Sequence, residues 1–197
     1  AQHAPFDVKI YSNEQNLGST KNFEKCLLHC VGDIIFLCDQ DDAWAPNKVA
    51  DQVAYLEMNP RHDAVFSNAS MIDEQSRLIE GTIWDEVEFT EGQRKRWRRG
   101  NAHEILYAGY IVTGATLAIR RDALDRLVPF PTQITQLIHD AWIALVLSLE
   151  DKIGFVEQNL LSYRIHSTQQ VGFGGKEEPI RLKDRIIRSR DKKLAPL

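Results

Sequence analysis

The stretch GDIIFLCDQDD, residues Gly32–Asp42, decides the fold class of this chain. Its apolar run, 34–38, is unbroken and has an aspartate on each side, which is typical of a central strand buried on both faces of a parallel sheet. The carboxylates of Asp39, Asp41 and Asp42 follow this run directly. Open α/β sheets hold their ligands at the carboxyl ends of their strands, so the pattern predicts an α/β domain with a site at the acidic loop, 39–42.

Helices are predicted on both sides of this strand. Apolar residues three and four apart indicate a helix over 19–30, and Gly32 follows it where helices end in a left-handed residue. A second helix begins at Pro46 and ends before Pro60. The alternation indicates a Rossmann-like mixed, mostly parallel sheet flanked by helices. Further elements are expected as strands over 7–11, 64–71, 114–119 and 155–165, a helix after His139, and a mobile or helical surface insertion over 81–113.

Composition limits the class of protein. The chain has 197 residues, of which 43% are apolar and 26% charged, which fits one globular domain and excludes fibrous and disordered classes. No apolar run reaches the roughly 20 residues of a membrane-spanning helix, and the first residues show no signal-peptide pattern. Cys26, Cys30 and Cys38 lack zinc-site spacing, and their apolar surroundings predict buried thiols in a reducing, cytoplasmic compartment.

Charge is distributed unevenly along the chain. The net charge is -4, yet residues 180–193 hold seven basic and two acidic residues. We therefore divide the chain into a domain, 1–178, and a basic tail helix, 179–197. The tail is either a solvated terminal helix or a peripheral contact with an anionic membrane, at the inner face of the cell membrane. The acidic body and the lack of a recognised binding module argue against nucleic acid as a partner.

The acidic loop has several alternative explanations. Packed carboxylates repel one another unless a cation compensates them, and Mg²⁺ or Mn²⁺ held by one or two carboxylates and by substrate phosphates is the natural compensator. Alternatively, the carboxylates only cap the helix that begins at Pro46. A phosphohydrolase of the haloacid dehalogenase type is a further alternative, although it expects Thr or Val where this chain has Ala43. An EF-hand is excluded, because the loop lacks Gly at its sixth position and Glu at its twelfth.

Several blocks of sequence follow one another in a fixed order. They are Asn16-Leu17-Gly18, Gly32–Leu37, Asp39-Gln40-Asp41-Asp42-x-Trp44-x-Pro46-x-Lys48, Thr113-Gly114-Ala115-Thr116, His139-Asp140-x-Trp142 and Tyr163-Arg164-x-His166. Together they resemble the family 2 glycosyltransferases of the GT-A fold, and especially the rhamnosyltransferase-like bacterial members. The resemblance runs from Ile10 to Gly172, and blocks in order are more specific than any single motif.

The resemblance implies transfer of a sugar, with inversion, from a nucleoside-diphosphate sugar to an acceptor hydroxyl. The donor would be dTDP- or UDP-linked, and the acceptor a saccharide or a lipid-linked molecule in bacterial surface polysaccharide or glycolipid synthesis. Asp41, Asp39 and His166 would bind Mn²⁺ or Mg²⁺, which stabilises negative charge on the departing diphosphate. The donor-binding residues would be Asp39, Asp42, Asn16, Lys48 and Arg164.

The same resemblance assigns the acceptor side. Asp140 would be the general base that activates the acceptor hydroxyl. Spacing alone also allows Asp140 to be the N-cap of the helix that follows it. The acceptor would contact Trp44, Gly114, His139 and Trp142, although Trp142 also lies on the apolar face of its helix.

The start of the chain departs from the family. Its members begin with an apolar strand, a helix and an Asp-rich segment that bind the nucleobase, and nothing before Asp7 matches these elements. We therefore expect an N-terminally truncated GT-A-like domain with exposed apolar sheet surface and self-association into a homo-oligomer. A non-catalytic remnant or interaction module of the same fold is the alternative. A glycine-rich loop, 169–175, is expected to close over the donor.

Overall fold

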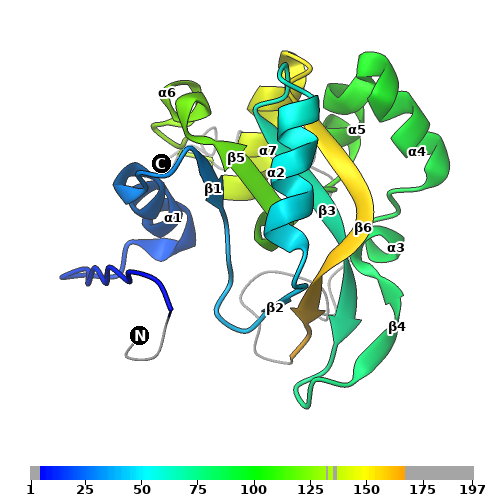
Figure 1. Ribbon diagram of the computed structural model, residues 1–197. Coiled ribbons are helices and arrows are strands. Elements are labelled where there is room, and N and C mark those ends of the chain that lie inside the picture. The colour runs from blue at the N-terminus through cyan, green and yellow to red at the C-terminus, as the bar shows by residue number, and fades with distance from the viewer. Residues whose placement is uncertain (1–4, 132, 135–136, 167–197) are drawn as a thin grey trace, which may run out of the picture.

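Figure 1 shows a computed structural model of the chain, which describes residues 5–131, 133–134 and 137–166. The strands are β1 (Ile34–Phe36), β2 (Ala43–Trp44), β3 (Ala64–Ile72), β4 (Leu78–Thr82), β5 (Leu117–Arg120) and β6 (Ile153–Arg164). The α-helices are α1 (Gly18–His29), α2 (Lys48–Met58), α3 (Ile83–Glu86), α4 (Glu91–Arg96), α5 (Ala102–Ala108), α6 (Leu124–Leu127) and α7 (His139–Leu149). Shorter helical turns of other types are η1 (Trp97–Asn101), η2 (Gly114–Thr116) and η3 (Arg121–Ala123).

The described strands form one mixed sheet in the order β1-β5-β3-β6-β2, with β4 beside β3. β3 and β6 are parallel, and the other pairs of described strands are antiparallel. The expected mixed α/β sheet flanked by helices is therefore confirmed, whereas its expected mostly parallel character is wrong. The reason is that an unbroken apolar run reports burial on both faces and not strand direction. β5 is equally apolar, with Leu117, Ala118 and Ile119 fully buried, and it runs antiparallel to both of its neighbours.

The strand over Ile34–Phe36 does not take the central place that the sequence predicted. β1 lies at one end of the strand order of the described residues, with Ile35 buried and Ile34 and Phe36 half-buried. The centre is β3, which pairs with β4, β5 and β6. Its residues Val65 and Phe66 are fully buried, so the sheet is built around this strand.

Helices cover both faces of the sheet, as Figure 1 shows for α2 on one face and α7 on the other. Side chains alternate along β3, which explains the two layers. Val65 packs with Leu56 of α2, whereas Phe66 belongs to a larger core that includes Ile143 of α7. The central strand therefore positions both helices, and α7 brings His139 and Asp140 to the sheet.

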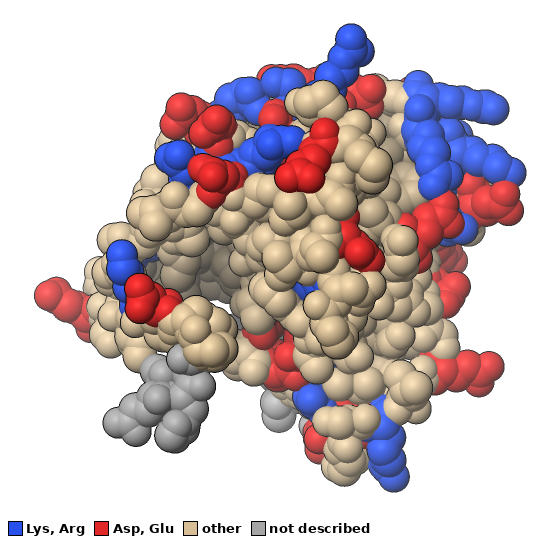
Figure 2. Space-filling view, viewed as in Figure 1, with Lys and Arg blue, Asp and Glu red and all other residues tan. Residues whose placement is uncertain are grey.

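The segment 81–113 is largely helical, as expected, but its two tryptophan side chains are part of the core and not of a surface insertion. Trp84 and Trp97 are 5% and 3% exposed, and both rings pack against Phe66 and Phe155. The indole N–H of Trp97 also donates to the carbonyl of Ile153 at 2.9 Å. Lys and Arg side chains gather on the surface over α4, which explains why the segment resembles an exposed insertion in the sequence (Figure 2).

Other local expectations are also corrected. Residues 7–11 form no strand in the described structure. All three cysteines are exposed and not buried: α1 buries Leu27 in place of Cys26, and Cys38 lies beyond the end of β1. The expected tail helix, 179–197, and the glycine-rich loop, 169–175, lie outside the described residues. Within the described ranges, no helix has the length and apolar character needed to cross a membrane.

Candidate active site

The acidic loop, 39–42, joins β1 to β2 and is held beside the end of β6. β2 pairs with β6, with Ala43 opposite Ser162, so the loop returns to the sheet immediately after its last aspartate. This pairing brings the loop carboxylates beside Arg164 and His166. Figure 2 shows that this face of the molecule is hollowed, with carboxylate side chains at the lower end of the hollow.

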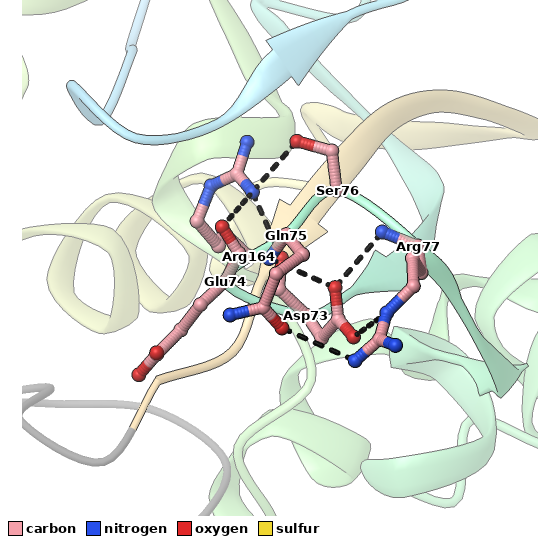
Figure 3. A network of polar contacts seen from close by, with 6 residues as sticks. All are labelled: Asp73, Glu74, Gln75, Ser76, Arg77 and Arg164. Atoms are coloured by element: carbon pink, nitrogen blue, oxygen red, sulfur yellow. Dashed lines mark hydrogen bonds and ion pairs between the residues drawn. The ribbon is translucent and has the colours of Figure 1, made fainter.

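Arg164 fastens the acidic loop to the turn between β3 and β4. Its backbone N–H donates to Asp42 Oδ1 at 2.9 Å, and its guanidinium Nε donates to the carbonyl of Asp41 at 2.8 Å. Nη1 donates to the carbonyl of Asp73 at 2.8 Å and to Ser76 Oγ at 3.0 Å, as Figure 3 shows. The guanidinium therefore positions the backbone of the loop, and its expected contact with the donor stays a prediction.

The turn that receives Arg164 is held by its own hydrogen bonds. The carboxylate of Asp73 accepts the backbone N–H groups of Gln75 and Arg77, both at 2.9 Å, and Arg77 Nε at 2.7 Å (Figure 3). These contacts, led by the backbone hydrogen bond from Arg77, lower the pKa of Asp73. The acidic loop is consequently anchored to an ordered support.

Asp41 and His166 form a pair at the open side of the loop. His166 Nε2 lies 2.8 Å from Asp41 Oδ2, and each side chain is 24% exposed. Carboxylate oxygens suit Mg²⁺ and Mn²⁺, and imidazole is a common metal ligand. No group of three or more His, Cys, Asp or Glu side chains in the described part of the chain forms a metal site. The pair thus fits a cation that takes one or two protein ligands and completes its shell with substrate phosphates and water.

Asp39 and Asp42 are half-buried, and their charges repel those of their neighbours. Burial, with the charges of Asp39 and Asp41, raises the pKa of Asp42 to about 7. Asp42 Oδ2 is buried and finds no hydrogen-bond partner among the described residues. Burial also raises the pKa of Asp39, and the charges of Asp41 and Asp140 add to this rise while His139 opposes it. The loop and the start of α7 therefore share one electrostatic site, which a cation would stabilise.

Asp140 lies in the first turn of α7 and is 5% exposed. Its Oδ2 accepts the N–H of Gly114 at 2.9 Å, and its Oδ1 accepts the N–H of Ala141 at 2.7 Å. The N-cap of α7 is Ile138, so the alternative role of Asp140 as the N-cap is wrong. Two backbone donors fix the orientation of this carboxylate, and its expected role as the general base stays a prediction.

Gly114 lies so close to the start of α7 that a side chain here would require its neighbours to move. A Cβ at this position would lie 3.0 Å from His139 Nε2 and 3.3 Å from Asp140 Oδ2. The ring of His139 is also held from the other side, because it stacks on Phe23 with 3.8 Å between the ring centroids. Gly114 therefore lets its own N–H reach Asp140, and the acceptor contacts expected of Gly114 and His139 stay predictions.

If Asp140 is the general base that the sequence predicts, Gly114→Ala is expected to lower the rate of the reaction by up to about a hundredfold, because the added Cβ would push on the Asp140 carboxylate and a displacement of about 1 Å has an effect of that size. The measurement is kcat together with the melting temperature. Gly109→Ala is the matched control, because a Cβ at Gly109 would meet no atom within 4 Å. Equal rates for the two variants would contradict this role of Gly114.

Lys48 is fully buried at the start of α2, directly after the acidic loop. Its Nζ donates to Gln52 Oε1 at 3.0 Å and lies 5.4 Å from the centroid of the Trp44 ring. Burial lowers the pKa of Lys48 to about 8, against the opposing effects of Cys38 and Asp42. The ammonium group supports Trp44 from inside the protein, and its expected contact with the donor stays a prediction.

Lys48→Met is expected to change how stability depends on pH. In the unfolded chain the pKa of Lys48 is near its ordinary value of 10.5, and in the folded chain it is about 8. Between these values the unfolded chain binds the additional proton, so the free energy of unfolding of the wild type rises with pH. The variant lacks this contribution. Denaturant titrations across this window should show the wild type gaining stability relative to Lys48→Met, and parallel pH profiles would refute the assignment.

Two predicted site residues make contacts within the fold, and their expected roles in ligand binding stay predictions. Asn16 is exposed, and its Oδ1 accepts the N–H of Gly18 at 2.8 Å at the start of α1. Trp142 Nε1 donates to the carbonyl of Leu127 at 2.8 Å, and its ring packs against the core. Trp44 is 37% exposed, and its expected contact with the acceptor also stays a prediction.

Tyr163 and Gln52 lie close to the site without having been assigned a role from the motifs. Tyr163 is 6% exposed, and burial together with the carboxylates of the loop and of Asp140 raises its pKa, so its hydroxyl stays protonated. Its signal in the sequence is its place in the block with Arg164 and His166. Gln52 is fully buried, and its signal is a polar residue one turn after Lys48 in an otherwise amphipathic helix.

Comparisons with known sequences place this site in a family. The sequence model of Glycosyl transferase family 2 matches residues 1–128. An uncharacterised glycosyltransferase of Methanocaldococcus jannaschii is 24% identical over 158 residues, which cover 80% of this chain and 51% of the relative. An uncharacterised protein of Mycobacterium tuberculosis is 24% identical over 156 residues, covering 78% and 41%. The putative glycosyltransferase EpsE of Bacillus subtilis is 31% identical over 74 residues, covering 38% and 27%.

The chain spans about half the length of the archaeal relative and less of the other two. The family match contains the acidic loop, Lys48 and Gly114, whereas Asp140 and His166 lie beyond its end. Both of these residues nevertheless contact the matched part, through Gly114 and Asp41 respectively. Because the family match extends over more than half of its residues, this chain belongs to Glycosyl transferase family 2.

Proposed function

We propose that this domain transfers a sugar, with inversion at the anomeric carbon, from a dTDP- or UDP-linked donor to an acceptor hydroxyl, and that it requires Mn²⁺ or Mg²⁺. The observation that carries the proposal is the pair of His166 Nε2 and Asp41 Oδ2, which lie 2.8 Å apart beside the half-buried carboxylates of Asp39 and Asp42. Family membership accounts for glycosyl transfer from an activated sugar. The arrangement of the carboxylates supports separate donor and acceptor sides.

On the donor side, Asp41 and His166 would hold the cation against the diphosphate. Their ligand atoms are 2.8 Å apart and partly exposed, which supports a shared ligand. When bound, the cation would neutralise the negative charge that develops on the departing diphosphate. Asp39 would bind the ribose or share the cation, and the unpaired Asp42 Oδ2 would accept a hydroxyl of the donor sugar. Arg164 would keep the loop backbone in place during these contacts.

On the acceptor side, Asp140 would take the proton of the acceptor hydroxyl. The hydroxyl oxygen then bonds to the anomeric carbon on the side opposite the diphosphate, and the bond from that carbon to the diphosphate breaks. The bonding electron pair leaves with the diphosphate, so the configuration inverts. Each oxygen of Asp140 accepts one backbone hydrogen bond and has a further lone pair for the proton. Trp44 would offer an exposed aromatic face to a sugar ring.

The narrower parts of the proposal rest on resemblance and on sequence. They are a rhamnosyl donor, a saccharide or lipid-linked acceptor of bacterial surface polysaccharide or glycolipid synthesis, and contact of the basic tail, 179–197, with the inner face of the cell membrane. Self-association is supported by the apolar side chains of Phe6, Ile10 and Val31, which are 71%, 75% and 80% exposed. The residue roles proposed above concern the diphosphate, the sugars and the acceptor, and none is proposed for the nucleobase.

The test is release of free nucleoside diphosphate from a panel of UDP- and dTDP-sugars, rhamnose included, with MnCl₂ and a saccharide acceptor. We expect acceptor-dependent release that stops with EDTA and returns with excess Mn²⁺. Binding of donors without release under any condition would support the non-catalytic alternative. Hydrolysis of a generic phosphoester in place of transfer would support the phosphohydrolase.

A further inference from the structure

Gln52 links three parts of the fold through one buried side chain. Its Nε2 donates to the carbonyl of Val65 in β3 at 3.2 Å and to the carbonyl of Thr116 in η2 at 2.9 Å. Its Oε1 accepts Lys48 Nζ at 3.0 Å. Both N–H groups of the amide and its oxygen are thus used. A buried apolar side chain of similar size would fill the same space, so the amide points to a requirement for these hydrogen bonds.

The hydrogen bond to Thr116 is connected to Asp140 through the turn 113–116. The N–H and the hydroxyl of Thr116 both donate to the carbonyl of Thr113, at 3.0 Å and 2.6 Å, which closes the turn 113–116. Gly114 lies inside this turn, and its N–H donates to Asp140 Oδ2 at 2.9 Å. The turn has little freedom against α7, because Gly114 already contacts His139 and Asp140 closely. A shift of the Thr116 carbonyl would therefore move the Gly114 N–H.

We infer that Gln52 is a positioning residue for Asp140: by holding the Thr116 carbonyl, it keeps the Gly114 N–H directed at the Asp140 carboxylate. The contact with Val65 anchors Gln52 to the fully buried central strand, so the turn is held relative to the centre of the sheet. Gln52 acts through the turn and is itself fully buried. The catalytic consequence rests on the function proposed above, whereas the positioning can be measured without any substrate.

Two variants separate the arms of the Gln52 amide. Gln52→Glu keeps an oxygen for Lys48 Nζ and removes both donors, so the Thr116 and Val65 carbonyls lose their partner. Lys48→Met removes the other arm and leaves the two donors of Gln52 in place. Gln52→Leu removes all three contacts and provides a second variant if Gln52→Glu folds poorly.

Amide hydrogen exchange followed by two-dimensional NMR tests the inference. In Gln52→Glu and in Gln52→Leu, the Gly114 amide proton should exchange about tenfold faster or more, relative to reference amides in the same variant. This is the effect of losing one buried hydrogen bond. The reference amides are those of Arg120, which donates to Asp63 at 2.7 Å, and Lys152, which donates to Leu147 at 2.8 Å. Lys48→Met should leave the ratio of Gly114 to reference exchange unchanged.

Three results would overturn the inference. The first is exchange of Gly114 at the wild-type rate in both Gln52 variants. The second is acceleration of Gly114 and the reference amides by the same factor, which would indicate general loss of stability. The third is a Lys48→Met variant that accelerates Gly114 as much as Gln52→Glu does.

Transfer kinetics then distinguish this inference from the proposed function. If both hold, Gln52→Glu lowers kcat while the KM for the donor stays near that of the wild type, because the Asp41 and His166 pair is untouched. Faster Gly114 exchange with unchanged kcat would support the positioning role and contradict Asp140 as the general base.

Discussion

Asp140→Asn is expected to lower kcat for sugar transfer by about a hundredfold to ten-thousandfold, the contribution typical of a general base. Asparagine matches the shape of aspartate, and its oxygen can still accept the Gly114 N–H that Asp140 Oδ2 accepts at 2.9 Å. It cannot take up a proton from the acceptor hydroxyl. The loss should therefore appear in kcat, with the KM for the donor close to that of the wild type. The melting temperature is expected to fall slightly, because the amide nitrogen cannot accept the Ala141 N–H that Asp140 Oδ1 accepts at 2.7 Å.

Asp125→Asn is the matched control for this substitution. Asp125 is an exposed carboxylate on α6, the helix that precedes α7 in the chain. The same change there should leave transfer unaffected. An Asp140→Asn variant with more than a tenth of the wild-type kcat would contradict the assignment of the base.

Asp41→Asn is expected to weaken the Mn²⁺-dependent binding of a nucleoside diphosphate by at least about tenfold. The substitution removes the negative charge of the member of the acidic loop that pairs with His166 at 2.8 Å. Without this charge, the site attracts a divalent cation less strongly, and the diphosphate loses the charge that bridges it to the protein. Binding measured in EDTA should be equally weak in the variant and the wild type.

Asp33→Asn tests whether any charge near β1 has the same effect. Asp33 precedes the strand that the acidic loop follows, and it is exposed at the opposite end of that strand. Its substitution should leave Mn²⁺-dependent binding unchanged. Equal losses in Asp33→Asn and Asp41→Asn would indicate a general effect of net charge and contradict a local site.

The acidic loop could be predicted from the sequence because its chemistry is local. An apolar run followed by Asp39, Asp41 and Asp42 specifies a strand end with repelling carboxylates, whatever the rest of the chain does. The direction of the neighbouring strands was not predictable in the same way. Burial on both faces is common to β1 and β5, and only their pairing through Ile35 and Ile119 shows them to be antiparallel.

Contacts between distant residues account for most of what the sequence did not reveal. His166 is 125 positions from Asp41, and only the family resemblance grouped them in the sequence; in the fold the two meet because β2 returns to the end of β6. Arg164 has the charge expected of a phosphate ligand, yet its guanidinium donates a hydrogen bond to the carbonyl of Asp73 in the turn between β3 and β4. Gln52 has no motif at all, and its role depends on the carbonyl of Thr116, 64 positions away.

Calorimetric titration of the purified chain with UDP and with dTDP, in MnCl₂ and in EDTA, tests the metal-dependent donor site most directly. We predict saturable binding of at least one of the two nucleotides in Mn²⁺, its loss in EDTA, and its weakening by at least about tenfold in Asp41→Asn but not in Asp33→Asn. Failure of both nucleotides to bind in Mn²⁺, or binding of equal strength in EDTA, would contradict it.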